Sequence, residues 1–474
     1  MASTLLNFLG TPQAYPDKRD AAARARDFRE IYEEFQPQKA AIQAGRCSQC
    51  GIPFCQVHCP LGNNIPDWLM LTAEGRLQEA YAVSSATNTF PEICGRICPQ
   101  DKLCEGNCVV EKDFGAITIG AVEKYITDTA WSNGWVAPLR AAQTLPLSVG
   151  IIGAGPAGLA AAEVLRRAGA SVTVYDRYDR VGGLLMYGIP NFKLEKSVVQ
   201  RRADWLADGG IEFALNTHVD AAAFGALRAK HDRLLIATGV YAARNTNALN
   251  SSLPGIVAAL PYLTASNKSN LGAALADEWN THGQRVVVIG GGDTAMDCVR
   301  TAIRQGAASV TCLYRRDKAN MPGSSREVHH AMEEGVTFEW LAQPVAFQGA
   351  GRVEAVAAER MQLVTAGRGR AEVAPLANSG FKLPADKVIL ALGFEPEDYP
   401  AQFGQPGLKT RANGTLAVDA GFQTSLPGVY AAGDSVRGAS LVVWAIKEGR
   451  DAAAAMLSEA AQSVRLEQHT AGRR

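Results

Sequence analysis

The chain has 474 residues, of which 47% are hydrophobic, and this is enough material for roughly three domains that each bury a core. Lysine plus arginine equals aspartate plus glutamate at 47 residues each, so no overall field draws nucleic acid or an anionic membrane, and neither is expected as a partner. No apolar run reaches the roughly eighteen residues of a membrane span, and the Leu5 to Leu9 patch is too short for the apolar region of a signal peptide.

Two helical stretches are predicted before residue 90. The charged segment Asp20 to Gln36 is helix-prone, and the segment Ile65 to Thr87 carries apolar residues at helical spacing. The second stretch separates two runs of cysteines, so the first part of the chain is predicted to be a helical, cysteine-bearing domain.

Eight of the ten cysteines lie between Cys47 and Cys108, in two short runs that each contain a Cys-Pro pair. Eight thiolates are the number that two four-iron clusters need, and short spacings followed by proline are typical of ferredoxin ligand runs. The sequence therefore predicts two 4Fe-4S clusters, held by the set Cys47, Cys50, Cys55, Cys59, Cys94, Cys98, Cys104 and Cys108.

Zinc and disulfides are the alternatives to this interpretation. Zinc sites usually use two C-x2-C knuckles, and here only Cys47 and Cys50 form such a pair. A disulfide framework is typical of small secreted domains, not of a chain of this length. Cys298 and Cys312 lie in apolar surroundings and are predicted to be ordinary core residues. A thiol-rich metal site favours a reducing compartment, and the cytoplasm is expected.

A first dinucleotide motif follows the proline-containing linker 137–147. The apolar strand Ser148 to Ile152 runs into a G-x-G-x-x-G turn that begins at Gly153, and an alanine-rich helix comes next. A second strand, Ser171 to Tyr175, ends at Asp176, where a carboxylate can accept hydrogen bonds from ribose hydroxyls. Together these elements predict a Rossmann-like unit with a domain boundary near residue 145.

A second motif follows the strand Arg285 to Ile289. The turn begins at Gly290 and has Ala295 in the place of the third glycine. The next strand, Val310 to Tyr314, ends in Arg315 and Arg316 instead of an acid. Guanidinium groups at this position suit the 2′-phosphate of NADP, so NADPH is predicted in preference to NADH. The alternative is that both arginines are solvated surface residues.

Two further strands and one aspartate complete the pattern. The segments Leu234 to Gly239 and Val388 to Gly393 share the cadence of an apolar strand that ends in a glycine turn, and they are interpreted as the two crossover strands. Near the C-terminus, Asp434 follows a strand and precedes a helix that begins near Leu441. This aspartate either reaches the ribityl or pyrophosphate group of a flavin or caps a helix.

The order of these motifs resembles the small (β) subunit of bacterial NADPH-dependent glutamate synthase over nearly the whole chain. The segments Gly182 to Leu194 and Tyr314 to Pro322 are particularly similar to that family. The same module is similar to the N-terminal half of dihydropyrimidine dehydrogenase and to subunits of ferredoxin-NADP transhydrogenases.

The resemblance implies an α/β fold with a helical N-terminal iron-sulfur domain followed by two Rossmann-like domains of the glutathione-reductase type. The NADPH domain is expected as an insertion in the FAD domain. The implied division is 1–144 for the iron-sulfur domain, 145–251 and 389–474 for the FAD domain, and 252–388 for the NADPH domain.

The resemblance also assigns residues to the two nucleotides. FAD would be held by Gly153, Ala154, Gly155, Pro156, Ala157, Gly158, Asp176, Gly183, Leu184, Val219, Thr238, Gly239, Gly433 and Asp434. NADPH would be held by Gly290, Gly292, Asp293, Thr294, Ala295, Arg315, Arg316 and Gly393.

For the clusters, the resemblance implies a crossed ligand set. Cys47, Cys50, Cys55 and Cys108 would hold one cluster, and Cys59, Cys98 and Cys104 would hold the second. The fourth ligand of the second cluster is either Cys94 or Glu123, and the sequence leaves both open.

The function implied is electron input. NADPH would reduce FAD, and the two clusters would pass electrons to a large subunit that carries FMN and an iron-sulfur cluster and makes glutamate from glutamine and 2-oxoglutarate, in a hetero-oligomer. No catalytic side chain is expected, because hydride passes between bound cofactors. The alternatives are an NADPH:ferredoxin-type oxidoreductase or transhydrogenase subunit, and a non-catalytic electron-transfer or scaffold subunit.

Overall fold

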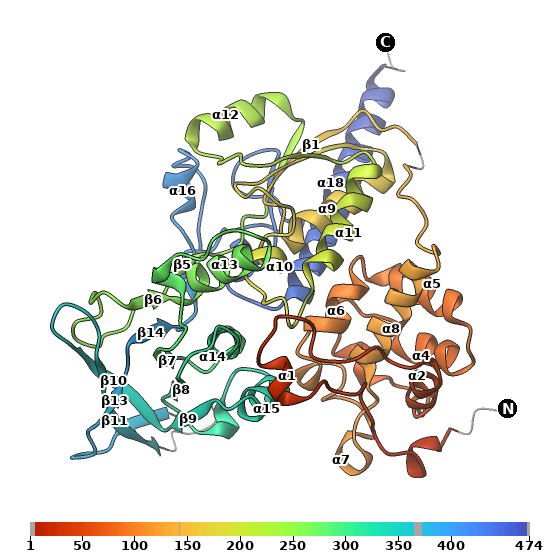
Figure 1. Cartoon of the computed structure of the whole chain (residues 1–474). Coiled ribbons are helices and arrows are strands. Elements are labelled where there is room, and N and C mark those ends of the chain that lie inside the picture. The colour runs from red at the N-terminus through yellow and green to blue at the C-terminus, as the bar shows by residue number, and fades with distance from the viewer. Residues whose placement is uncertain (1–4, 142, 365–371, 472–474) are drawn as a thin grey trace.

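The computed structural model describes residues 5–141, 143–364 and 372–471. In Figure 1 a helical lobe made by the first part of the chain lies beside two lobes that are each built around a sheet. The predicted fold class is therefore confirmed. No helix in these ranges is long and apolar enough to cross a membrane.

The first lobe consists of short helices around a small apolar core. Trp68 is fully buried there, together with Ala40, Val122 and Ile126. Prolines stand in the first turns of several of these helices, where a missing N–H costs nothing. The helices are η1 (Asn7–Leu9), α1 (Ala21–Arg24), α2 (Pro37–Ala44), α3 (Phe54–Val57), α4 (Ile65–Ala73), α5 (Leu77–Thr87), α6 (Pro91–Ile97), η2 (Gln100–Lys102), α7 (Glu111–Phe114) and α8 (Ile119–Ser132).

Two of the helix predictions in this lobe need correction. The segment Ile65 to Thr87 is not one helix, because Gly75 adopts a φ of +78° between α4 and α5, a conformation that only glycine takes readily. The segment Asp20 to Gln36 is helical only in α1. Beyond α1 a charged side chain binds another part of the chain instead, since Glu30 forms ion pairs with Arg96 and Lys124.

The second lobe is built on a five-stranded parallel sheet of order β16-β4-β1-β2-β3. Its strands are β1 (Ser148–Ile152), β2 (Ser171–Tyr175), β3 (Glu212–Ala214), β4 (Arg233–Ile236) and β16 (Val429–Ala431). The strand β16 comes from the C-terminal part of the chain, so the two ends of this unit share one sheet. The helices are α9 (Pro156–Ala168), α10 (Leu184–Tyr187), α11 (Lys196–Asp208), α12 (Ala221–Lys230), α16 (Tyr399–Gln402), α17 (Asp434–Arg437) and α18 (Val442–Ala471).

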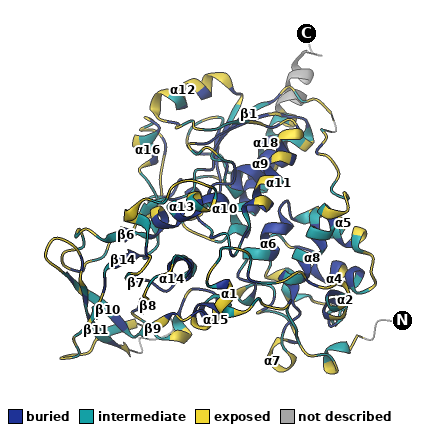
Figure 2. Ribbon diagram, viewed as in Figure 1, coloured by how far each residue is buried: buried dark blue, intermediate teal, exposed yellow. Residues whose placement is uncertain are grey.

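Helices α9 and α18 pack against each other at the centre of this lobe, and Figure 2 shows α9 and the adjoining part of α18 as buried. A Cβ added at Gly449 of α18 would lie 2.1 Å from the carbonyl oxygen of Ala157. Close backbone approach at this glycine therefore brings the C-terminal part of the chain to the first glycine turn.

The third lobe contains a second five-stranded parallel sheet of order β6-β14-β7-β8-β9, and an antiparallel group lies next to it. The parallel strands are β6 (Ile256–Ala258), β7 (Arg285–Ile289), β8 (Ser309–Tyr314), β9 (Thr337–Trp340) and β14 (Lys387–Leu390). The antiparallel strands are β10 (Ala342–Gln348), β11 (Ala355–Val364), β12 (Glu372–Pro375) and β13 (Phe381–Pro384). The helices are α13 (Ala259–Asn270), η3 (Asp277–Trp279), α14 (Asp293–Arg304), η4 (Lys318–Asn320) and α15 (Ser325–Glu333).

The two crossings between the sheet lobes pair with each other as β5 (Ala242–Ala243) and β15 (Phe394–Glu395). The third lobe extends beyond both ends of the predicted NADPH domain, residues 252–388. The boundary between 388 and 389 cuts through β14, which pairs with β6 and β7. The boundary between 251 and 252 leaves out Leu249, whose N–H donates to Val345 in the third lobe.

Candidate functional site

The first glycine turn lies where β1 ends and α9 begins. Gly153 has a φ of +112°, and a Cβ there would lie 2.3 Å from the carbonyl oxygen of Ala237. A Cβ at Gly158 would lie 2.0 Å from the carbonyl oxygen of Gly153, so helix and strand approach closely. A Cβ added at Gly155 would have no atom within 4 Å. The backbone is therefore open at the one position where a pyrophosphate has to approach, and the turn fits a dinucleotide.

Asp176 holds this turn together. Its Oδ2 accepts a hydrogen bond from Ala154 N at 2.7 Å, and its Oδ1 accepts one from Tyr178 N at 2.8 Å. Burial raises the pKa of this carboxyl group. Each carboxylate oxygen can accept a second hydrogen bond, so the predicted contact with ribose hydroxyls is compatible with this role.

Two segments distant in sequence meet the same turn. Gly182 N donates to Ala154 O at 2.9 Å, and a Cβ at Gly183 would lie 2.9 Å from Gly155 Cα. From the other side, a Cβ at Gly433 would lie 2.8 Å from the Cβ of Ala157.

Three further residues predicted to bind FAD lie near the first glycine turn or begin a helix beside it, and a fourth lies elsewhere. Asp434 begins α17 next to Gly433, and burial raises its pKa to about 6. Thr238 lies against Gly153, and Leu184 begins α10. Val219 instead lies in a separate apolar cluster with Tyr175 and Phe224, so its contact with FAD stays a prediction.

The second glycine turn repeats this geometry between β7 and α14. A Cβ at Gly290, whose φ is +148°, would lie 2.2 Å from Ala391 O, and one at Gly292 would meet nothing within 4 Å. Asp293 and Thr294 form the first turn of α14, and Ala295 is fully buried behind them.

The remaining residues predicted to bind NADPH follow strand ends. Arg315 and Arg316 follow β8 directly, and Arg315 is exposed. Gly393 follows β14 with a φ of +95°, and its carbonyl oxygen accepts a hydrogen bond from Arg244 N.

One predicted cluster set surrounds a single pocket in the helical lobe. Cys47, Cys50, Cys55 and Cys108 line it together with apolar side chains, and its empty volume is about 350 Å³, part of it open to solvent. Burial raises the pKa of Cys47 to about 11 and that of Cys55 to about 12. Four thiols in an apolar pocket fit a cluster that takes them as thiolates.

The second predicted set lies deeper in the lobe. Cys98 and Cys94 are hydrogen-bonded to each other, and this contact together with burial raises the pKa of Cys98. The charge of Glu123 acts on Cys59, Cys98 and Cys104, so the carboxyl group lies near all three. Burial raises the pKa of Glu123 to about 8.

The structure keeps both candidates for the fourth ligand close to this set. The Oε1 atom of Glu123 accepts hydrogen bonds from Asn63 Nδ2 and Asn88 Nδ2, each at 3.1 Å. The sulfur of Cys94 contacts Asn88 Oδ1 at 3.8 Å. Neither asparagine was expected from the sequence, because no motif or spacing marks a residue that orients a ligand.

Cys298 and Cys312 are fully buried in the core of the third lobe, as predicted. All ten cysteines lie within the described residues and are free thiols.

Comparison with known proteins gives two family matches. Residues 24–135 match the family described as dihydropyrimidine dehydrogenase domain II, 4Fe-4S cluster. Residues 147–449 match the pyridine nucleotide-disulphide oxidoreductases. The first match coincides with the cysteine-bearing lobe and the second with the two sheets.

Similar proteins of known name extend over almost the whole chain. The NADPH glutamate synthase small chain of Azospirillum brasilense is 61% identical over 95% of this chain and 95% of its own length. That of Escherichia coli K12 is 45% identical over 96% of this chain and 98% of its own length. The putative oxidoreductase AegA of Escherichia coli K12 is 45% identical over 92% of this chain, which covers 68% of AegA.

Among solved structures, FprA of Mycobacterium tuberculosis in complex with NADPH has a TM-score of 0.58 at 20% identity. The match covers 68% of this chain and 86% of FprA. At this identity the likeness extends to the fold alone.

Proposed function

Since the chain belongs to the family of the small chains of NADPH glutamate synthase, we propose that it is the electron-input subunit of such an enzyme. It oxidises NADPH and passes the electrons through FAD and two 4Fe-4S clusters to the FMN of a large subunit. That subunit, which carries its own iron-sulfur cluster, makes L-glutamate from L-glutamine and 2-oxoglutarate. The two subunits form a hetero-oligomer, and the reducing conditions that thiolate clusters need assign the complex to the cytoplasm.

The observation that carries this proposal is the convergence of distant cysteines on one pocket. Cys108 lies beside Cys47, Cys50 and Cys55 although about sixty residues separate them in sequence. A crossed set of this kind is what two-cluster ferredoxins use. A zinc site would instead combine two C-x2-C knuckles, and Cys55 and Cys108 form no second knuckle.

Within the chain, each group of residues has a distinct task. The backbone of the first glycine turn, with Gly183, Gly433 and Asp434, orients FAD. The second turn binds the pyrophosphate of NADPH, and Arg315 and Arg316 bind its 2′-phosphate. When bound, FAD supplies the change from hydride transfer to single-electron transfer. No described side chain has to act as an acid, a base or a nucleophile in this scheme.

The same pocket provides the route by which electrons leave. Four large apolar side chains near the ligands of the first cluster are exposed to solvent: Ile52, Phe54, Val57 and Val109, at 67%, 47%, 64% and 58%. An exposed apolar rim around a redox centre is a surface that a partner protein can cover. We therefore place the contact with the large subunit at this rim.

A second candidate function is an NADPH oxidoreductase with a different acceptor. The similarity to AegA favours it, because AegA carries the same module in a longer chain. A non-catalytic role would require that FAD and NADPH not bind.

The test is to purify the chain without oxygen, with whatever binds it, and to measure FAD, FMN, iron, sulfide and NADPH-driven glutamate formation. FAD, about eight iron atoms from two four-iron clusters and an FMN-bearing partner are expected, together with that activity. Reduction of ferredoxin or dyes with no such partner would favour the second candidate. Absence of FAD would favour the third.

A further inference from the structure

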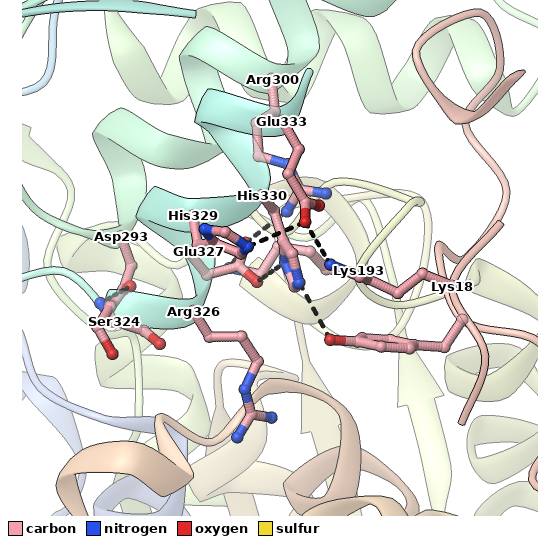
Figure 3. A network of polar contacts seen from close by, with 12 residues as sticks. Lys18, Lys193, Asp293, Arg300, Ser324, Arg326, Glu327, His329, His330 and Glu333 are labelled. Atoms are coloured by element: carbon pink, nitrogen blue, oxygen red, sulfur yellow. Dashed lines mark hydrogen bonds and ion pairs between the residues drawn. The ribbon is translucent and has the colours of Figure 1, made fainter. Parts of the chain in front are cut away.

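Helix α15 begins directly behind the turn assigned to NADPH. In Figure 3, Ser324 at the start of this helix faces Asp293, and Ser324 N donates to Asp293 Oδ1 at 2.8 Å. One residue earlier, Gly323 N donates to Gly291 O at 3.0 Å. A Cβ at Gly323 would lie 3.1 Å from that oxygen, so the two segments are in close contact. The segment before α15 therefore supports the nucleotide-binding turn.

The N-terminus of α15 is capped by a residue of the iron-sulfur lobe. Ser324 is the N-cap residue, but its side chain makes no capping hydrogen bond within its own helix. Its Oγ donates instead to Asp101 Oδ1 at 2.9 Å. Ser325 N and Ser325 Oγ both donate to Asp101 Oδ2, also at 2.9 Å. An aspartate that accepts a backbone N–H at a helix N-terminus is a favourable cap, and here it comes from another domain.

Asp101 lies in the loop that carries cluster cysteines, between Cys98 and Cys104. The neighbours of Asp101 strengthen the same junction. Arg326 of α15, labelled in Figure 3, donates to Gln100 Oε1 at 3.2 Å and to Glu105 Oε2 at 2.5 Å. Lys102 Nζ donates to the carbonyl oxygen of Pro322. The loop that holds the second cluster is thus bonded to the segment that supports the NADPH turn.

We propose that Asp101 is a positioning residue for NADPH, and that through Ser324 and Ser325 the iron-sulfur domain holds the turn Gly291 to Asp293 in the conformation that binds the nucleotide. The proposal rests on the proposed function, since it takes this turn as the NADPH site. In this proposal Asp101 acts through the two serines and not on the nucleotide itself.

The physical argument is preorganisation. A turn that is always in its binding conformation binds its ligand with full affinity. If only a fraction of the molecules have that conformation, the apparent dissociation constant rises by the inverse of that fraction. The three hydrogen bonds to Asp101 involve a charged acceptor and are stronger than neutral ones. Without them, the segment before α15 keeps its contacts with Asp293 and Gly291 and the bond from Lys102 to Pro322, but it loses the charged cap at Ser324 and Ser325, and the binding conformation becomes less populated.

The test is the affinity for NADP⁺ of the full-length protein with its cofactors, measured by titration of the flavin absorbance. Asp101→Ala is expected to raise the dissociation constant about tenfold, because the binding-competent fraction falls. The Michaelis constant for NADPH in dye reduction should rise by a similar factor, while kcat at saturation changes less than about twofold, since binding is lost equally in the ground state and the transition state. Asp113→Ala, at an exposed position of α7 in the same domain, is the matched control and should leave both constants unchanged.

Contents of FAD and iron are measured on every variant, because a merely structural role would lower them without changing the affinity of the loaded protein. If Asp101→Ala loses iron, the double variant Ser324→Ala and Ser325→Ala decides, since it removes two hydroxyl donors and leaves the cluster loop intact. A dissociation constant raised about threefold in that variant supports the proposal, because one backbone bond to Asp101 remains. An unchanged constant overturns it.

The two proposals fail in different ways. If the unaltered protein binds no NADP⁺, the proposed function and this inference both fail. If it binds NADP⁺, and Asp101→Ala with full cofactor content binds equally well, only this inference is overturned.

Discussion

Glu92 of the helical lobe and Arg202 of the FAD lobe form a bidentate ion pair that is almost completely excluded from water. Arg202 Nε donates to Glu92 Oε1 at 2.7 Å, and Arg202 Nη2 donates to Glu92 Oε2 at 2.9 Å. The two side chains are 0% and 5% exposed. This pair joins α6, which carries Cys94, to α11 of the flavin-binding unit.

Removal of one partner of this pair should destabilise the protein strongly. Glu92→Gln leaves the buried Arg202 charge with only the longer contact to Glu163 at 4.0 Å, and breaking a buried pair costs about 3–5 kcal/mol. The measurement is the midpoint of urea unfolding followed by circular dichroism. Glu74→Gln breaks a solvent-exposed pair with Arg76, which contributes little because water screens it, and serves as the control. Equal shifts in the two variants would contradict the prediction.

Acid should destabilise the protein by protonating Glu334, which follows α15 and forms ion pairs with Arg300 and Arg304 of α14. Burial alone would raise the pKa of Glu334, but hydrogen bonds and charges from Arg304 and Arg300 hold it at about 2. Because the folded pKa is depressed, the stabilisation is fully present above the unfolded value of 4.5 and is lost as the pH falls from there towards 2, a total of about 3 kcal/mol. Glu334→Gln should therefore flatten the loss of stability over this interval in acid-unfolding curves. Glu372→Gln is the control, because Glu372 is exposed, and it should leave the acid-unfolding curve unchanged.

FAD retention should depend on the close approach at Gly158. In Gly158→Ala the new Cβ would lie 2.0 Å from Gly153 O, so the turn must move, and overpacking of this kind costs about 1–3 kcal/mol. FAD affinity is expected to fall roughly tenfold to a hundredfold, as measured by the flavin that remains after dialysis. Gly225→Ala is the control, because this position of α12 is exposed and a Cβ there meets nothing within 4 Å. Full flavin content in Gly158→Ala would refute this reading of the turn.

The choice of coenzyme should depend on Arg315 and Arg316. Each can donate charged hydrogen bonds to a 2′-phosphate, worth about 1.5–3 kcal/mol, so Arg315→Ala and Arg316→Ala should each lower kcat/KM for NADPH about 10-fold to 100-fold. The same constant for NADH should change little, because NADH has no such phosphate. Arg285→Ala, at the opposite end of strand β7, is the control. A parallel loss with both coenzymes would assign the arginines a structural role instead.

The second cluster should depend on Glu123 more than on Cys94. Asn63 and Asn88 hold Oε1 of Glu123, and the other carboxylate oxygen remains to meet iron. Glu123→Ala is expected to lose about four iron atoms from the protein, one cluster's content, whereas Cys94→Ala keeps them. Iron analysis and electron paramagnetic resonance of the reduced protein distinguish the two variants. The reverse result would make Cys94 the ligand.

Local patterns predicted the strands and turns well, because each depends on neighbours in sequence. The strand Ser171 to Tyr175 was predicted with the bounds that β2 has, and Gly153 and Gly290 both take the positive φ expected of a tight turn. Helix ends were predicted less well, because the break at Gly75 comes from one glycine within an otherwise helical pattern. The charges of residues 20–36 also suggested a helix, yet the helix ends at Arg24, and Glu30 instead forms ion pairs with Arg96 and Lys124 of other helices.

The sequence by itself determined the kind of chemistry, since thiolate runs, glycine turns and paired arginines can be recognised from residues close together in the chain. Only the tertiary structure decided which groups work together. Cys108 reaches the pocket of Cys47, Glu123 reaches Asn63 and Asn88, and Asp101 caps a helix that begins at Ser325. These contacts follow from the packing of helices and sheets against one another. They join residues far apart in sequence, and hydrophobic periodicity reports only on neighbours in the chain.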